Sequence, residues 1–293
     1  MNDHLKGVLL TSTGVLAIVP DSILIRLIDA PHLTIVFWRA ALTTLTLFVA
    51  LGIYYRKALP SRLRDMGLTG IAYGILSSAG ISCFVLAVQH TTIASATMIV
   101  ATTPVFAALV SRIFLGERLS LRTLLTIISC LGGIGIITGG GNLGGSGFLG
   151  EAFALGTAIA LASSLTIARA ARHMSMIPAA ALGYLFASLA TAAFAAPSQM
   201  QPADFAYAAL LGCFFIPIGV SLLTLGPRYI SSAEVSLLLL LEGTLAPLLA
   251  WYVLDEVPAM RTFVGGAIII AAIVISNLAV LWKPKGAARH RAP

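Results

Sequence analysis

The stretch LLLLLEGTLAPLLAWYVLDE, residues Leu237 to Glu256, is almost entirely apolar, yet it carries a carboxyl group, Glu242, near its middle. An apolar run of about 20 residues is the length that an α-helix needs to cross a lipid bilayer. A β-barrel strand would instead alternate apolar and polar residues over about 10 residues. The stretch therefore predicts a transmembrane helix with an ionisable group inside it.

The rest of the chain has the same apolar character. Of its 293 residues, 58% are hydrophobic and 10% are charged, and the mean hydropathy is +0.98. A soluble domain with so few charges could not cover its surface in water, so we predict an all-α integral membrane protein. The first apolar run lacks a small-residue cleavage site and is expected to be a span rather than a signal peptide. Breaks at charges, Gly and Pro give ten transmembrane helices, at 5–28, 32–55, 65–88, 92–114, 120–139, 149–170, 178–196, 204–226, 232–254 and 260–282.

The basic residues orient these spans. The net charge of +7 does not come from one dense patch of the kind that binds nucleic acid, because the basic residues lie at the ends of apolar runs. If the amino terminus is cytoplasmic, all of the 18 basic residues except Arg26, Arg39 and Arg261 fall on the inner side. This bias predicts that both termini are cytoplasmic.

The chain repeats itself. FVLAVQHTTIASATMIV (84–100) aligns without gaps with LTLGPRYISSAEVSLLL (223–239) at an offset of 139 residues, and the same offset pairs Glu117 with Glu256. Each half then holds five spans, and because five is odd, the second half must be inverted in the membrane. Inverted repeats around a site near the midplane are typical of secondary transporters. We expect a first repeat at 1–140, a Gly-rich periplasmic linker at 141–148, a second repeat at 149–283 and a basic cytoplasmic tail at 284–293.

Several short motifs carry a resemblance to a known family. The segments LGERL (115–119), LDEVP (254–258), ASAT (94–97) and SAEV (232–235), together with the duplicated layout, resemble the EamA branch of the drug/metabolite transporter superfamily over nearly the whole chain. The resemblance implies a bacterial inner-membrane transporter with two inverted five-helix repeats around a central cavity. Within the superfamily, the chain is most similar to bacterial amino-acid exporters. One departure is that Gly243 follows Glu242 where the family often has proline, which comes here only at Pro247.

Glu242 lies about 11 residues into its span, hence about 16 Å deep, close to the midplane. An ionisable residue at that depth indicates function by default and is expected to face the bundle interior. It would couple transport to protons or pair with a substrate ammonium. The alternative is a protonated acid that hydrogen-bonds two helices together. The repeat aligns Glu242 with Thr103, so the acid occurs once and the cavity is expected to be asymmetric.

Two further charges lie inside predicted spans. Asp21 follows Pro20 in the first span and Arg39 lies in the second, both about 10 Å below the outer surface. Their equal depth predicts an ion pair, which would be structural or would open as a gate. Pro20 is expected to kink the first span, and helix breaks in transporters often border the site.

The remaining candidates form a set that predicts an amphipathic cavity for a small, partly apolar solute. Each could instead be ordinary helix packing or a hydroxyl bonded to its own helix. They are Phe37, Trp38, Tyr73, Ser77, Ser78, Ser82, Thr102, Thr103, Ser163, Ser164 and Phe214.

The other motifs in the sequence are weak evidence of a binding or catalytic site. Gly139, Gly141 and Gly144 fit a dinucleotide-binding spacing but follow a membrane span rather than a strand. Ser82 and His90 could suggest an intramembrane serine protease, but nothing in the sequence places the two residues together. The three cysteines have no metal spacing, and there is no Walker motif, so we expect no metal, cofactor, enzymatic activity or direct use of ATP.

The sequence thus predicts a secondary transporter or facilitator, a monomer at its simplest, that exports small metabolites, amino acids including aromatic ones above all, by alternating access. Export of drugs or nucleotide sugars is the first alternative. A membrane accessory protein that transports nothing is the second.

Overall fold

The computed structural model describes residues 3–116, 121–138, 146–171, 174–225, 229–230 and 232–281, and every regular element in these ranges is helical. The first half contains α1 (Asp3–Ile18), α2 (Asp21–Leu27), α3 (His32–Tyr55), η1 (Arg56–Ala58), α4 (Leu59–His90), α5 (Ile93–Val100), α6 (Thr103–Leu115) and α7 (Leu121–Thr138). The second contains α8 (Ser146–Ala170), α9 (Ile177–Ala192), η2 (Pro197–Gln199), α10 (Pro202–Leu210), the π-helical η3 (Leu211–Phe215), α11 (Ile216–Leu225), α12 (Ser232–Leu254) and α13 (Met260–Leu281).

Each predicted span coincides with one of these helices or with a broken helix. The Glu117 motif, most of the predicted linker and the basic tail lie outside the described residues. Within the described residues, five stretches are long and apolar enough to cross a membrane, and one of them holds both α3 and α4. They are His4–Leu27, His32–His90, Ile93–Phe114, Phe148–Ala168 and Pro202–Leu225, and shorter apolar helices lie at Thr123–Thr138, Ile177–Ala192, Leu238–Leu254 and Met260–Ser276. The protein is a membrane-embedded, multi-pass helical protein.

Two membrane passes are interrupted. The break between α1 and α2 falls at Pro20, which ends the regular ladder and leaves Asp21 in the first turn of α2. The break between α5 and α6 falls at Ala101–Thr102, just before Pro104 in the first turn of α6. Both breaks put helix ends inside the bundle, and at the second break the Ala101 and Thr102 backbone N–H groups donate to Thr97 O and Ile99 O.

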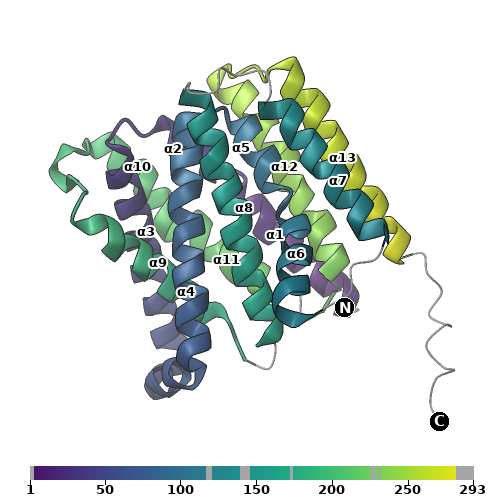
Figure 1. Ribbon diagram of the computed structural model, residues 1–293. Coiled ribbons are helices and arrows are strands. Elements are labelled where there is room, and N and C mark those ends of the chain that lie inside the picture. Colours follow the sequence, from purple (N-terminus) through teal and green to yellow (C-terminus); the bar gives the residue numbers. More distant parts are fainter. Residues whose placement is uncertain are drawn as a thin grey trace, which may run out of the picture.

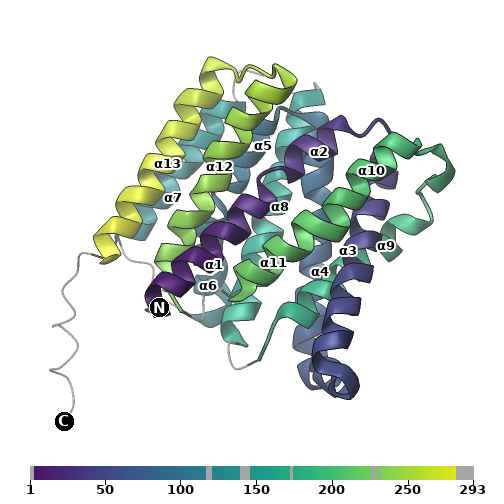
Figure 2. The same ribbon diagram turned by 180° about the vertical axis from the view of Figure 1, so that it is seen from behind.

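The helices form one bundle in which the two halves interleave (Figures 1 and 2). In both views α7 and α13 run side by side along one edge, and α1 begins at the end of the molecule where α13 finishes. The most extensive contacts join the halves: α4 packs against α8 and α9, α3 against α9, and α1 against α11.

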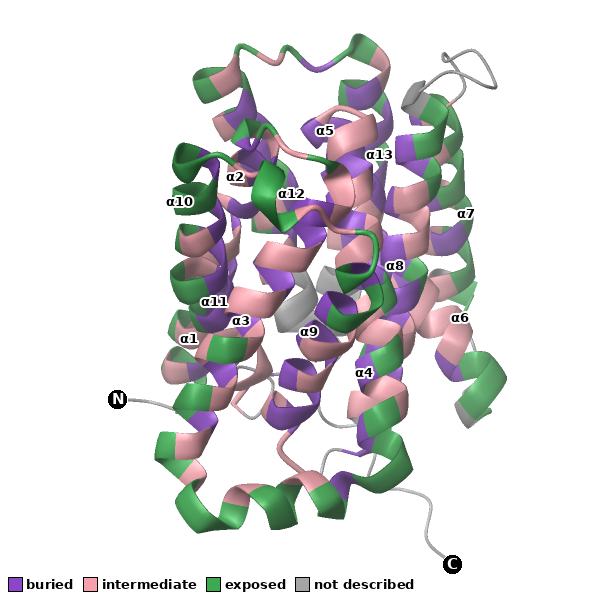
Figure 3. Ribbon diagram, turned by 90° about the vertical axis from the view of Figure 1, so that its left-hand side faces the viewer, coloured by how far each residue is buried: buried purple, intermediate pink, exposed green. Residues whose placement is uncertain are grey.

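Glycine allows the closest of these approaches. A Cβ atom on Gly265 of α13 would stand 2.5 Å from the Gly133 carbonyl oxygen of α7, and a Cβ on Gly133 would stand 2.8 Å from the Gly265 oxygen. Small residues let membrane helices pack backbone against backbone in this way. Large apolar side chains cover much of the outside, where lipid replaces water as the solvent, and buried residues face inward (Figure 3).

Candidate functional site

An ion pair lies at the centre of the candidate site. The Arg39 guanidinium donates from Nε to Asp21 Oδ1 at 3.0 Å and from Nη2 to Asp21 Oδ2 at 2.5 Å. The two side chains are only 5% and 3% exposed. This two-pronged geometry between α3 and α2 is the strongest form of an arginine–carboxylate contact. The pairing expected from equal depth on antiparallel helices is therefore present.

Local backbone features hold the pair in place. Asp21 is positioned by the break at Pro20, which starts α2 at that residue. Arg39 lies where α3 is crossed closely by η3, since a Cβ on Gly212 would be 3.1 Å from the Arg39 carbonyl oxygen. Thr43 donates its hydroxyl to that same carbonyl oxygen at 2.7 Å. The arginine backbone thus has little freedom to move.

Helices of both halves complete the site around the pair. The Arg39 guanidinium lies over the Tyr184 ring of α9, 6.0 Å from its centroid. Glu242 of α12 lies near enough to interact electrostatically with Asp21 and Arg39, and Tyr73 of α4 interacts with Tyr184. Tyr184 is 6% exposed, whereas Glu242 and Tyr73 are half-buried. The site therefore takes α2, α3 and α4 from the first half and α9 and α12 from the second.

The residue after Glu242 lies where α12 meets the break between α5 and α6. A Cβ on Gly243 would lie 3.4 Å from the Ala101 Cβ, an ordinary van der Waals distance, so this contact does not require glycine. The helix is continuous from Ser232 to Leu254 and includes Pro247. Glu242 therefore lies on an unbroken helix beside a broken one.

Most of the predicted hydroxyl candidates bond to carbonyl oxygens of the backbone close to them. Thr102 donates to Ile99 O and Thr103 to Val100 O, both at 2.6 Å, across the break between α5 and α6. Similar bonds to their own helices engage Ser78, Ser82, Ser163 and Ser164. Each of these hydroxyls already donates its proton to the backbone, so it could only accept a hydrogen bond from a solute.

The other predicted candidates are spread over several surfaces. Ser77 packs against Gly183 at the contact between α4 and α9. The Trp38 ring meets Phe37 and Phe205 edge-on, at centroid distances of 5.3 and 5.0 Å. Phe214 is 53% exposed, so it belongs to the outer surface of η3 and not to the charged cluster.

A second charged cluster joins the halves at one end of the bundle. Glu256, from the segment between α12 and α13, accepts a hydrogen bond from the Ile93 backbone N–H at 2.6 Å and so caps α5. Arg26 lies 3.5 Å from the Glu256 carboxylate and also donates to the Thr91 carbonyl oxygen. We call Arg26, Thr91, Ile93 and Glu256 the outer latch, because the predicted orientation places them on the outer side.

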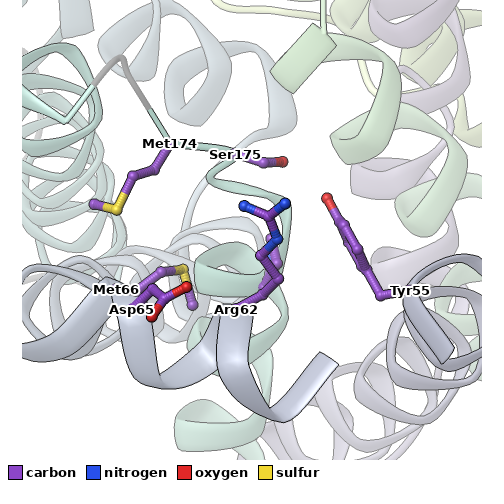
Figure 4. Close-up of a pocket in the computed structure, with 7 residues that line it drawn as sticks. Tyr55, Arg62, Asp65, Met66, Met174 and Ser175 are labelled. Carbon is purple, nitrogen blue, oxygen red and sulfur yellow. The ribbon is translucent and has the colours of Figure 1, made fainter. Parts of the chain in front are cut away.

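At the opposite end, a small pocket of about 90 Å³ lies between the α3–α4 turn and the start of α9. Figure 4 shows the Arg62 guanidinium between the Tyr55 hydroxyl and Ser175, with Met66 and Met174 beside it. Arg62 and Asp65 are exposed, so this pocket is a solvent-facing recess rather than a membrane-interior site.

Sequence reasoning missed Tyr184 and the outer latch. Tyr184 is the one tyrosine in the Ala-rich α9. A polar aromatic residue in such a helix could have been recognised from the sequence as a candidate site residue. Arg26 and Glu256 are far apart in sequence, and the repeat pairs Glu256 with Glu117 rather than with Arg26, so only the fold brings them together. Among the described residues, no group of three or more His, Cys, Asp or Glu side chains could hold a metal ion.

A bundle of apolar helices that buries a charged cluster between its halves defines a polytopic membrane protein with an internal polar site. The family model of the EamA-like transporter family matches residues 5–139 and again residues 148–278. The chain belongs to the EamA-like transporter family, whose members are membrane transporters of small solutes. The family model thus matches the chain twice, once in each half.

The comparison with solved structures shows similarity of fold only. A protein of known crystal structure is similar over 94% of this chain and 99% of its own, with a TM-score of 0.63 and 14% sequence identity. No curated protein sequence matches this chain.

Proposed function

We propose that this protein is a secondary transporter or facilitator of the bacterial inner membrane that exports small metabolites, amino acids above all, by alternating access of two inverted five-helix repeats. Both termini are cytoplasmic in this proposal, and the monomer is the transporting unit. The observation that carries it is the cluster of Asp21, Arg39, Tyr184 and Glu242, buried in a membrane protein at the junction of its halves. Charged groups kept there are costly, and in membrane proteins they mark solute or ion pathways.

The pattern of helix packing supports the inverted repeat. The third pass of the first half, α4, packs against the first pass of the second, α8, and reciprocally α11 packs against α1. The second passes, α3 and α9, contact each other, as do the fifth passes, α7 and α13. Exchange of the two halves leaves this contact pattern unchanged, as a two-fold axis in the membrane plane requires.

The chemistry of the site favours small solutes with balanced charge over nucleotide sugars. A nucleotide sugar brings two phosphate charges and calls for several basic partners. Here the described cluster contains one guanidinium, already paired with Asp21, and a further carboxyl group, Glu242. Drug export remains the alternative for the same site, and a non-transporting accessory protein the alternative for the whole chain.

Counterflow in proteoliposomes tests the proposal. Vesicles containing the purified chain are loaded with unlabelled L-phenylalanine or L-alanine, and entry of the labelled amino acid is followed. Saturable accumulation that protein-free vesicles lack is the expected result. Absence of flux from folded, inserted protein for amino acids, other metabolites and drugs alike would contradict a transport function.

A further inference from the structure

One nitrogen of the buried arginine has no partner among the residues that the structure describes. Asp21 occupies Nε and Nη2 of Arg39, but Nη1 is buried and makes no hydrogen bond with any of these residues. The whole residue is 4% exposed, so it is shielded from bulk solvent. A guanidinium nitrogen in that position is costly to leave unsatisfied, because it has lost its hydration and gained nothing.

The geometry indicates what is missing. The bidentate contact with Asp21 fixes the plane of the guanidinium, whose central carbon lies over the Tyr184 ring. The N–H groups of Nη1 therefore have a fixed direction within the guanidinium plane. An oxygen acceptor is needed there, and a carboxylate gives the strongest hydrogen bond with a guanidinium.

The surrounding charges restrict the acceptor further. Asp21 balances Arg39, and Glu242 adds a carboxyl group that interacts electrostatically with both. A free anion bound to Nη1 would be repelled by any charge on Glu242, whereas a solute that also carries an ammonium group would meet an acceptor there. A zwitterion satisfies Nη1 and Glu242 without changing the net charge of the site.

We propose that Arg39 Nη1 anchors the carboxylate of a zwitterionic amino acid. This inference rests on the transport function proposed above and specifies its substrate class. Asp21 is then a positioning residue that orients the guanidinium. Solutes that keep the ammonium but lack a carboxylate, such as amino-acid amides and simple amines, are excluded from the substrate class.

The wild-type protein provides the first test, so no variant has to fold. L-phenylalanine, L-phenylalaninamide, phenethylamine and 3-phenylpropionate compete with labelled L-phenylalanine in counterflow. Phenethylamine leaves Nη1 unpaired, and the neutral amide oxygen accepts a weaker hydrogen bond than a carboxylate. Both should therefore compete less well than L-phenylalanine, the amine at least about tenfold, the loss expected for one charged hydrogen bond. Equal competition by L-phenylalaninamide overturns the inference while leaving amino-acid transport intact.

A binding measurement separates this inference from the transport proposal. The same four compounds are titrated against the purified chain, and stabilisation against thermal unfolding is recorded. Stabilisation by L-phenylalanine, but not by its amide or by phenethylamine, supports the anchor even if no flux is found. Stabilisation that does not depend on the carboxylate, or none by any of the four, overturns it.

The variant Arg39→Lys tests the assignment to Nη1. A lysine has one nitrogen, which Asp21 would occupy, so the preference for L-phenylalanine over its amide should fall to within about twofold of unity. Arg64→Lys, at an exposed position outside the site, serves as the control and should keep the full preference. Retention of the preference in a folded Arg39→Lys protein contradicts the inference, and if this variant does not fold, the wild-type series decides.

Discussion

Glu242 and Gly243 are adjacent in α12. Gly243 contacts Ala101 at the break between α5 and α6, and Glu242 is half-buried and interacts electrostatically with the Asp21–Arg39 pair. An acid that only tied two helices together would act through a hydrogen bond between them. The interaction of Glu242 with both charges of the candidate site favours a role in the transport cycle.

The substitution Glu242→Gln tests that role. The amide has the same size, so the fold should persist, but it cannot take up or release a proton. We expect counterflow that depends on pH in the wild type to lose that dependence between about pH 5 and pH 8, or to fall about tenfold or more if the ammonium contact dominates. Wild-type counterflow and pH dependence in Glu242→Gln would contradict the role, and Glu242→Asp is the control that keeps the acid.

The Asp21–Arg39 pair also has a structural role that can be measured separately. Removing one partner of a buried pair leaves an uncompensated charge, so Arg39→Gln should lower the free energy of unfolding by about 3–5 kcal/mol. The double variant Asp21→Asn with Arg39→Gln removes both charges and should recover most of that loss. Chemical unfolding in detergent micelles measures both. A double variant as unstable as the single one would show that the charge itself is not the cause.

At the scale of elements, glycine decides where helices cross. The α7–α13 contact places Gly133 and Gly265 backbone to backbone, and α1 meets α11 in the same manner at Gly14 and Gly219. In a bilayer the lipid tails are as apolar as the helix surfaces. Close packing, rather than exclusion of water, therefore holds such contacts together.

Gly265→Ala should destabilise the protein, because its new Cβ would lie 2.5 Å from a backbone oxygen that has no side-chain freedom to yield. The expected loss is about 1–3 kcal/mol of unfolding free energy. Gly132→Ala, on α7, is the matched control because nothing lies within 4 Å of its Cβ position. Since alanine favours a helix over glycine by about 0.5–1 kcal/mol, the control should be neutral or stabilising. Equal effects at the two positions would rule out close packing as the cause.

At the scale of the whole molecule, the outer latch joins α2 and the start of α5 to the segment before α13. Glu256 of the second half caps α5 of the first half, and Arg26 bridges it to Thr91. If the halves rock against each other, these contacts must break once in each cycle. The latch would then stabilise the state that is closed to the outside.

A covalent link across the latch should therefore stop transport. In a background without Cys83, Cys130 and Cys213, the variants Arg26→Cys and Glu256→Cys are combined and joined with a short, reducible bifunctional thiol reagent. We expect counterflow to fall about tenfold or more and to return on reduction, as gating by rigid-body closure predicts. Each single-cysteine variant treated alike is the control. Full activity in the linked protein would show that these segments do not separate during transport.

The sequence predicted the helical class, the positions of the helices and the Asp21–Arg39 pair, and the physical reasons are local. Lipid demands apolar runs of a fixed length, and charges inside them stand out and can be compared by depth. The hydroxyl candidates were harder to interpret, because a serine in an apolar helix looks the same whether it faces a solute or its own carbonyl oxygen. Thr102, Thr103 and Ser164 bond to the backbone, and Phe214 faces outward.

The sequence alone determined that this protein folds in lipid, because the chain is too apolar to do so in water. Its duplication also restricts the topology. What only the tertiary structure decided is which groups meet. Tyr184 joins Arg39, and Glu256 caps α5, because helices distant in sequence cross at particular points. The same crossings bury Arg39 Nη1, which makes no hydrogen bond with any residue that the structure describes. Those crossings depend on side-chain shape and on backbone approach to within a few tenths of an ångström, which a hydropathy pattern does not encode.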